Sequence, residues 1–125
     1  MSNLLPWLTK RREKFYVGDA LQDSIDSFLK MVDDGAEVRE FPDAIIVVEE
    51  YGLEPDKRLW LLFDKFNMGV VRVIKTVSND YGSADLYAST HDIRIRNLLV
   101  KLGYSQYDQD ANDFWLVKQG DKNGL

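Results

Sequence analysis

Hydrophobic residues in the first third of the chain repeat at the spacing of one helix face. Between Asp19 and Gly35 this stripe consists of Leu21, Ile25, Phe28, Leu29 and Val32. Asp19 followed by Gln22 three positions later is typical of a capping box, and Gly35 suits the residue after a helix end. The pattern therefore predicts a helix that starts at Asp19 and ends before Gly35.

The pattern then changes to short β-branched and aromatic runs separated by turn residues. The runs cover 38–41, 44–50 and 58–63, and Gly, Pro and Asp are concentrated between them. Three such runs in succession predict an antiparallel meander. Because the last two runs carry hydrophobic residues at consecutive positions, both faces of this sheet are expected to be covered.

Residues 68–81 fit two patterns. Their valines and isoleucine favour a strand, whereas Val70, Ile74, Val77 and Tyr81 form one helical stripe. We choose a helix here, with a strand as the alternative. Further along, the pattern predicts a short strand at 85–89, a helix at 92–102 ended by Gly103, and a hairpin from 104–107 and 114–118.

The chain is long enough for one hydrophobic core and too short for two ordinary domains. Its 125 residues are expected to divide into an N-terminal arm at 1–18, a single domain at 19–118 and a flexible tail at 119–125. The arm carries Trp and Leu residues suited to docking on the domain or on a partner protein.

Charge and composition exclude several classes of function. A net charge of −5 disfavours nucleic-acid binding, and we interpret the basic residues Lys10, Arg11, Arg12 and Lys14 as a solvated helix face. The chain has no cysteine, which excludes thiolate chemistry and disulfides. No apolar run could cross a membrane, so a cytoplasmic protein is expected.

The sequence predicts no metal site. His91 is the only histidine, so no second imidazole exists to complete a metal centre or a proton relay. Asp108, Asp110 and Asn112 alternate as in a calcium loop, but the loop glycine and the final glutamate of such a loop are missing. A hairpin turn explains this segment better.

The segment 86–104 and the hairpin that follows resemble the C-terminal half of a GNAT (Gcn5-related N-acetyltransferase) domain. In that family a strand leads through a polar segment into a helix that closes with a sequence similar to Lys101-Leu102-Gly103-Tyr104, and two antiparallel strands follow. The resemblance implies an α+β fold of three layers, with a central, mostly antiparallel mixed sheet flanked by helices and a C-terminal β-hairpin.

The resemblance also implies where catalytic groups would lie. The coenzyme A phosphates would meet Asn67, Met68, Gly69 and Val70, but this loop has one glycine only, and Asp64 precedes it. The position of the family's proton-donating tyrosine is Leu99, which cannot transfer a proton, so Tyr87 or Tyr104 would have to substitute.

Three side chains are candidates for catalysis: Glu49 and Glu50 at the end of a central strand, and His91 at a strand-to-helix junction. Adjacent strand residues point to opposite faces, so only one of the two glutamates could face a cleft. A solubilising charge is the simpler interpretation of such a carboxylate.

These observations predict a non-catalytic GNAT-like protein without a cofactor, acting through protein contacts of residues 1–18. The chain also resembles internal virion and assembly proteins of short-tailed bacteriophages, which would place it in the host cytoplasm or in the virion. The alternative is an N-acetyltransferase that uses acetyl coenzyme A with substituted catalytic residues.

Overall fold

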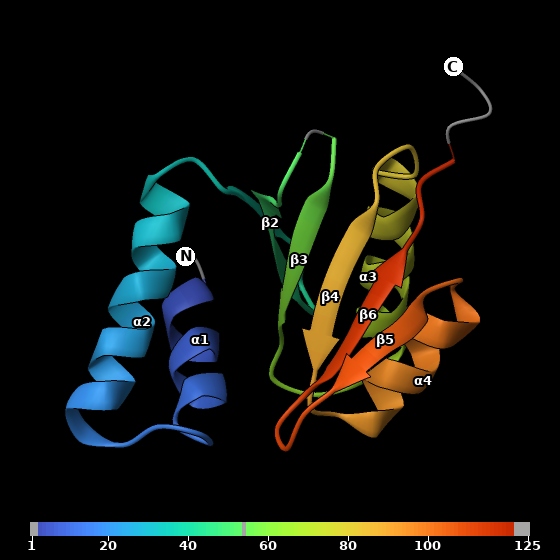
Figure 1. The fold of residues 1–125 in the computed structure, drawn as a ribbon. Helices are drawn as coiled ribbons and strands as arrows, with labels where there is room; N and C mark the ends of the chain where they lie inside the picture. Colours follow the sequence, from blue (N-terminus) through green and yellow to red (C-terminus); the bar gives the residue numbers. More distant parts are fainter. Residues whose placement is uncertain (1–2, 54, 122–125) are drawn as a thin grey trace.

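The structure is a computed structural model that describes residues 3–53 and 55–121. Its elements in chain order are α1 (Leu4–Arg12), α2 (Gly18–Asp33), β1 (Glu37–Glu40), β2 (Ile45–Glu50), β3 (Lys57–Leu62), α3 (Met68–Asp80), β4 (Leu86–Thr90), α4 (Ile93–Lys101), β5 (Ser105–Gln109) and β6 (Phe114–Lys118). The strands form one sheet, with α1 and α2 on one side and α3 and α4 on the other (Figure 1). This confirms the three-layer α+β fold predicted from the sequence.

The sheet consists of two antiparallel units joined by one parallel pair. Its strand order is β1-β2-β3-β4-β6-β5, and all neighbouring strands are antiparallel except β3 and β4. These two run parallel because α3 carries the chain back across the sheet between them, as parallel pairing requires. The predicted meander and the predicted C-terminal hairpin are both confirmed.

Strand β2 is buried on both faces, as its run of hydrophobic residues predicted. Ile46 and Val48 pack in the core on the α3 and α4 side, whereas Ile45 and Val47 pack in the core on the α1 and α2 side. Alternation along one strand therefore supplies both hydrophobic layers.

Helix α3 resolves the ambiguous segment in favour of the helix. It spans Met68–Asp80, and its hydrophobic stripe, including Val70 and Val77, is fully buried. The β-branched residues favoured a strand locally, but burial of this stripe against the sheet outweighs that small propensity difference.

The predicted capping box of the first long helix is wrong. Helix α2 starts at Gly18, its N-cap residue is Val17, and no side chain caps it. Asp19 lies within the first turn instead, where a negative charge still interacts favourably with the helix dipole. Gly35 follows the helix with a φ of 118°, as predicted for a glycine that ends a helix.

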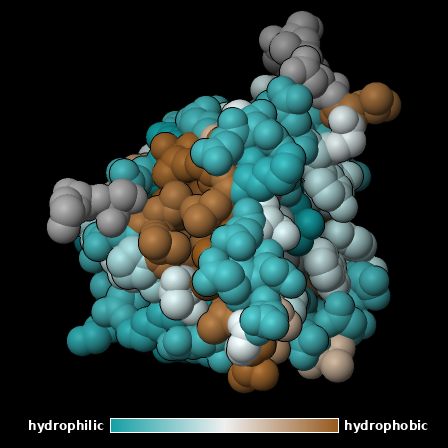
Figure 2. Space-filling model, turned by 90° about the vertical axis from the view of Figure 1, so that its left-hand side faces the viewer, coloured by the Kyte–Doolittle hydropathy of each residue, from teal (hydrophilic) through white to brown (hydrophobic). Residues whose placement is uncertain are grey.

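The N-terminal segment forms a helix that belongs to the domain core. Leu8 of α1 is fully buried and lies in one cluster with Phe28 of α2 and Leu62 of β3. Figure 2 views the molecule from this helical side, where one hydrophobic area interrupts a mostly hydrophilic surface.

The C-terminal residues that the structure describes are bound to the domain. The Gly120 N–H donates to Asp85 Oδ1 at 2.8 Å, and the Asp121 N–H donates to the Gly82 carbonyl at 2.8 Å. Of the tail predicted at 119–125, Gly120 and Asp121 thus make hydrogen bonds to the domain, and 122–125 lie outside the described residues.

Replacing Leu8 tests whether α1 is part of the core. Leu8→Ala should lower the free energy of unfolding by about 2–5 kcal/mol, because it leaves a cavity in a closed cluster. Leu5→Ala is the matched control: Leu5 is 52% exposed, and its loss should change stability by less than about 0.5 kcal/mol. Denaturant titration measures both, and equal small effects would show that α1 only docks loosely.

Candidate functional site

The sheet opens between its two parallel strands. β3 and β4 pair at three positions, the last being Leu59 with Ala88, and no later pair forms in the described part of the chain. β3 nevertheless continues to Leu62 and β4 to Thr90. The two strands therefore diverge toward their carboxyl ends, which is where ligands bind in sheets of this kind.

The diverging edge of β3 carries a backbone donor that points into the opening. The Lys57 N–H donates across to the Asp85 carbonyl at 3.0 Å, which identifies the edge that faces β4. Because N–H groups alternate between the two edges of a strand, the Leu61 N–H points the same way. It lies beyond the last paired position, where it could stabilise a negatively charged oxygen.

Three spaces meet at this opening. A narrow interstrand cavity of about 30 Å³ lies between the strands and has a mostly hydrophobic lining that includes Leu59, Leu61, Ala88 and Leu99. A cleft of about 380 Å³, here named the Lys65 cleft, lies at the carboxyl ends of both strands. A second cleft of about 380 Å³, the Arg58 cleft, lies between the sheet and the α1/α2 layer.

The Lys65 cleft is basic. Its charged lining consists of five cationic side chains and two carboxylates, namely Lys10, Arg11, Lys14, Lys65, Arg94, Asp64 and Asp92. Lys10 forms an ion pair with Asp64, and this hydrogen bond holds the pKa of the Asp64 carboxyl below its usual range. Arg94 forms a second ion pair with Asp92 at 2.7 Å, so the remaining cations are available for an anion.

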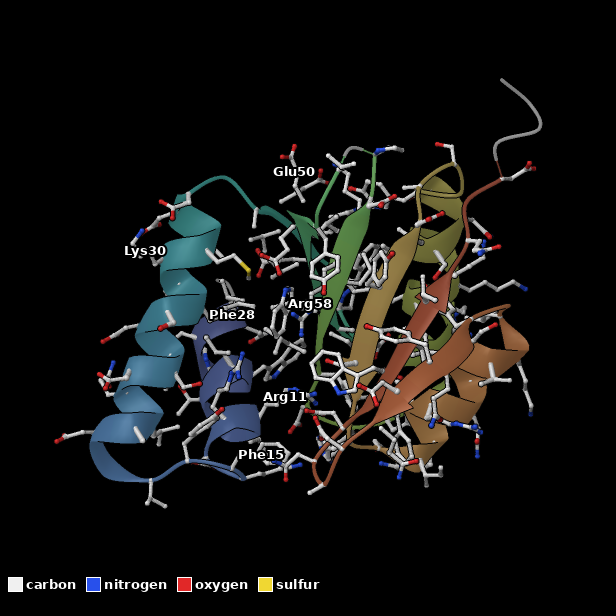
Figure 3. All side chains as sticks on the ribbon, viewed as in Figure 1. Arg11, Phe15, Phe28, Lys30, Glu50 and Arg58 are labelled. Carbon is white, nitrogen blue, oxygen red and sulfur yellow. The ribbon has the colours of Figure 1, made fainter. Side chains whose placement is uncertain are left out.

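Arg11 links the three spaces, because its side chain lines all of them. Figure 3 shows Arg11 pointing from the end of α1 toward the sheet. Arg11 and Arg12 are both half-buried, and burial lowers the pKa of each guanidinium. The interpretation of this basic cluster as a solvated helix face is therefore wrong for these two residues.

The Arg58 cleft combines cations with aromatic walls. Arg58 lies 4.1 Å from the Trp60 ring centre and 5.3 Å from the Trp115 ring centre. Arg12 lies 5.6 Å from Trp60 and 5.7 Å from Phe28. These distances are in the range of cation–π contacts.

The predicted phosphate loop is occupied by the protein itself. Asn67 caps α3, its Oδ1 accepting from the Val70 N–H at 3.0 Å. A Cβ at Gly69 would lie 1.9 Å from Asp43 Oδ2, so the Asp43 carboxylate is packed directly against this glycine. Met68 is 65% exposed. A negative side chain thus occupies the helix start that a phosphate would otherwise favour.

The two predicted glutamates lie away from the opening. Glu49 Oε1 accepts from Trp60 Nε1 at 2.9 Å, which positions the indole ring. Glu50 is exposed at the end of β2, and Figure 3 shows it at the opposite end of the molecule from Arg11 and Phe15. The structure does not bring either glutamate together with His91.

Leu99 lines the interstrand cavity, so this residue faces the opening as an apolar wall. Neither proposed substitute is well suited to replace a proton donor there. Tyr104 is buried, its hydroxyl lies 2.8 Å from the Ser78 hydroxyl, and burial raises its pKa to about 12. Tyr87 contacts Tyr51 and Tyr107, and burial also raises its pKa.

His91 lies in the Lys65 cleft at the carboxyl end of β4. Its ring packs edge-on against Phe15, with 5.0 Å between ring centres. Nδ1 is buried and has no hydrogen-bond partner among the described residues. Burial, and then the charges of Arg11 and Lys14, lower the pKa of His91. The imidazole is therefore neutral near pH 7 and could accept a proton.

Sequence reasoning missed the residues that make the Arg58 cleft. Arg58 and Trp60 are on β3, Ser89 is on β4, and Asp113 and Trp115 come from the hairpin. One signal was present: Arg58 and Trp60 are two positions apart on a strand, so both face the same side of the sheet. Their meeting with α1 depends on tertiary packing that no local pattern contains.

Comparison with solved structures identifies a related fold. The chain is similar to an aminoglycoside 6′-acetyltransferase type Ii with a TM-score of 0.62 and 20% sequence identity, over 94% of this chain and 87% of that one. The chain has the GNAT fold. A scan against models of protein families finds no match, and a search of curated proteins finds none either.

Two further searches cover the described ranges 3–53 and 55–121. None of the helices there combines the length and hydrophobicity that a bilayer-crossing segment needs. In the same ranges, no cluster of three or more acidic or histidine side chains is arranged to hold a metal ion.

The environment of His91 predicts a measurable pKa. The chain has a single histidine, so one imidazole signal in an NMR titration reports it, and its pKa should lie below the ordinary value of about 6.5. The unfolded chain then binds a proton at His91 more readily than the folded chain does. The contribution of neutral His91 to the free energy of unfolding is therefore complete above about pH 6.5, and it is lost as the pH falls through the pKa of His91 in the folded protein.

The substitution His91→Gln should therefore reduce the loss of stability between pH 7.5 and pH 5.5, a range above the titration of ordinary carboxylates. A measured imidazole pKa at or above 6.5, or an unchanged pH dependence in the variant, would contradict this description of the site.

Proposed function

We propose that the chain binds acyl coenzyme A at the opening between β3 and β4 and transfers the acyl group to an amine. The observation that carries this proposal is the divergence of the two parallel strands beyond Leu59 and Ala88, with a basic cleft at its end and a second cleft on the other side. A donor and an acceptor could therefore approach one point from two directions. The structural similarity to an acetyltransferase supports the same function.

The residues present fit coenzyme A through side chains and not through a glycine-rich loop. Five cationic side chains against two carboxylates line the Lys65 cleft, which suits the phosphates of the cofactor. Asp43 fills the start of α3, so Lys14, Lys65 and Arg11 would hold the phosphates. The apolar wall of the interstrand cavity suits the arm of the cofactor, although its volume of about 30 Å³ requires Arg11 to move aside.

Coenzyme A, when bound, supplies an acyl thioester, so that transfer forms an amide C–N bond, breaks the C–S bond, and moves one amine proton as the thiol is released. The Leu61 N–H, on the edge of β3 that alternation assigns to the side of β4, would hold a carbonyl oxygen and stabilise negative charge on it. His91 lines the Lys65 cleft, and its Nδ1, which has no partner within the described residues, would accept the proton that the amine loses. Leu99 keeps water out of the cavity.

A second candidate function is a GNAT-fold protein without transferase activity that acts through protein contacts. Two residues favour it: Asp43 places a negative charge at the helix start where a transferase would bind phosphate, and Leu99 is apolar at the position where a transferase would have a proton donor. The exposed residues Phe15, Tyr16 and Val17 and the hydrophobic area in Figure 2 offer surfaces for a partner. An internal virion protein of a bacteriophage remains a hypothesis within this candidate.

Calorimetric titration with acetyl coenzyme A tests the proposed function. The expected result is micromolar binding that weakens as salt is added, because the contacts are largely ionic. Lys65→Gln and Lys14→Gln should each weaken binding about threefold to fivefold, as expected for a partly exposed charge contact. Pantetheine, which lacks the phosphates, should bind much more weakly.

Lys75→Gln provides the matched control, because Lys75 is exposed on α3 and does not line the Lys65 cleft. This variant should bind acetyl coenzyme A as the unchanged chain does. Absence of binding at millimolar acetyl coenzyme A would contradict the proposal and leave the second candidate. Equal losses in all three variants would show that net charge alone, and not this cleft, attracts the cofactor.

A further inference from the structure

The charge of the Arg58 cleft has the wrong sign for a cationic ligand. Four cationic side chains line it, Arg11, Arg12, Lys14 and Arg58, against the single carboxylate of Asp113. The similar solved structure is named as an aminoglycoside acetyltransferase, and aminoglycosides carry several positive charges. Like charges in a half-buried cleft repel strongly, so this lining disfavours a polycation.

The arginines in this cleft are under-satisfied by the protein. Arg12 is half-buried and hydrogen-bonds Tyr16 through its side chain, but its Nε has no hydrogen-bond partner among the described residues. Arg58 Nη2 lies 3.5 Å from Ser89 Oγ, at the long limit of a hydrogen bond. A buried donor without a partner costs free energy, and a carboxylate is the group that a guanidinium binds best, through two parallel hydrogen bonds.

The aromatic walls are held in fixed orientations. Trp60 Nε1 donates to Glu49 Oε1 at 2.9 Å, and Trp115 Nε1 donates to Asp110 Oδ2 at 3.1 Å. Both indole rings contact Arg58, so the guanidinium and the two rings form one rigid part of the cleft wall. Such walls favour a ligand with a planar, apolar body, because little ordering of side chains is needed on binding.

The cleft also offers a carboxylate that could bind the amine of a ligand. Asp113 is the one carboxylate among the described residues that line the cleft, and it comes from the turn between β5 and β6. Ser89 lines both this cleft and the interstrand cavity. A ligand with its carboxylate at the arginines could thus direct an amine toward Asp113 and the opening between the strands.

We infer that the Arg58 cleft binds a small amine that carries a carboxylate and an aromatic body, of the type of an aromatic amino acid. The volume of about 380 Å³ is within the range of small-molecule sites. The role of this ligand as the acyl acceptor rests on the proposed function. Binding itself depends on the cleft and needs no cofactor.

Paired probes test the inference on the full chain without coenzyme A. L-Phenylalanine and phenethylamine differ only by the carboxylate, and Trp60 and Trp115 in the cleft walls make tryptophan fluorescence a direct readout. Phenylalanine should bind at least about tenfold more tightly than phenethylamine, the factor expected for one charged hydrogen-bonded contact. Kanamycin, a cationic aminoglycoside, should bind more weakly than phenylalanine.

Two variants locate the contact. Arg58→Gln should weaken phenylalanine binding at least about tenfold and leave phenethylamine binding nearly unchanged. Lys14→Gln changes an exposed side chain that also lines the cleft, so it should fold normally and weaken phenylalanine binding by a smaller factor. Lys75→Gln, outside the cleft, should have no effect.

The outcomes separate this inference from the proposed function. Equal or tighter binding of phenethylamine or kanamycin would overturn the inference, as would unchanged phenylalanine binding in both cleft variants. If acetyl coenzyme A binds and phenylalanine does not, the inference fails while the proposed function stands. If phenylalanine binds as expected and acetyl coenzyme A does not, the ligand class is correct and the transferase function fails.

Discussion

The candidate site depends on one constraint, the parallel pairing of β3 and β4. Two antiparallel units meet there, and the pairing extends through three positions only before the strands diverge. Where the pair diverges, backbone donors lose the neighbouring strand as a partner and a gap opens in the middle of an otherwise continuous sheet. Folded proteins normally satisfy such backbone groups. Here the gap is bordered by Leu59, Leu61 and Ala88, and Arg11 also lines it. The opening is therefore the natural place for a ligand.

Helix α1 both contributes to the hydrophobic core and carries the arginines that line this opening. Leu8 anchors α1 in the core, and the next turn places Arg11 and Arg12 between the layers. Burying two guanidinium groups beside each other is unfavourable unless anions compensate, and Asp113 and Asp92 are the carboxylates whose charges act favourably on Arg11. An anionic ligand on either side of the opening would supply further negative charge and so offset the free-energy cost of burying Arg11 and Arg12.

Most of the fold could be predicted from the sequence, because hydrophobic periodicity determines which face of each element is buried. The meander and the hairpin follow from it, whereas the segment at Met68–Asp80 fitted a strand as well as the helix that the structure shows. The site could be predicted only in part. Of the predicted site residues, His91 lies in the Lys65 cleft because it directly follows β4, whereas Gly69 packs against Asp43. Arg11 and Arg58 were missed because a basic residue on a helix or a strand looks solvated until the facing element is known, and only the packing of α1 on β3 decides it.

Mapping where acetyl coenzyme A perturbs the backbone amides of the protein in two-dimensional NMR spectra tests the proposed cofactor site most directly. The largest shifts are expected at the diverging ends of β3 and β4, at Leu61 to Phe66 and at His91 to Ile93, with smaller changes at Arg11. Shifts confined to the exposed surface of α2 or to the β5–β6 turn, or no shifts at millimolar acetyl coenzyme A, would contradict the claim that the opening is a cofactor site.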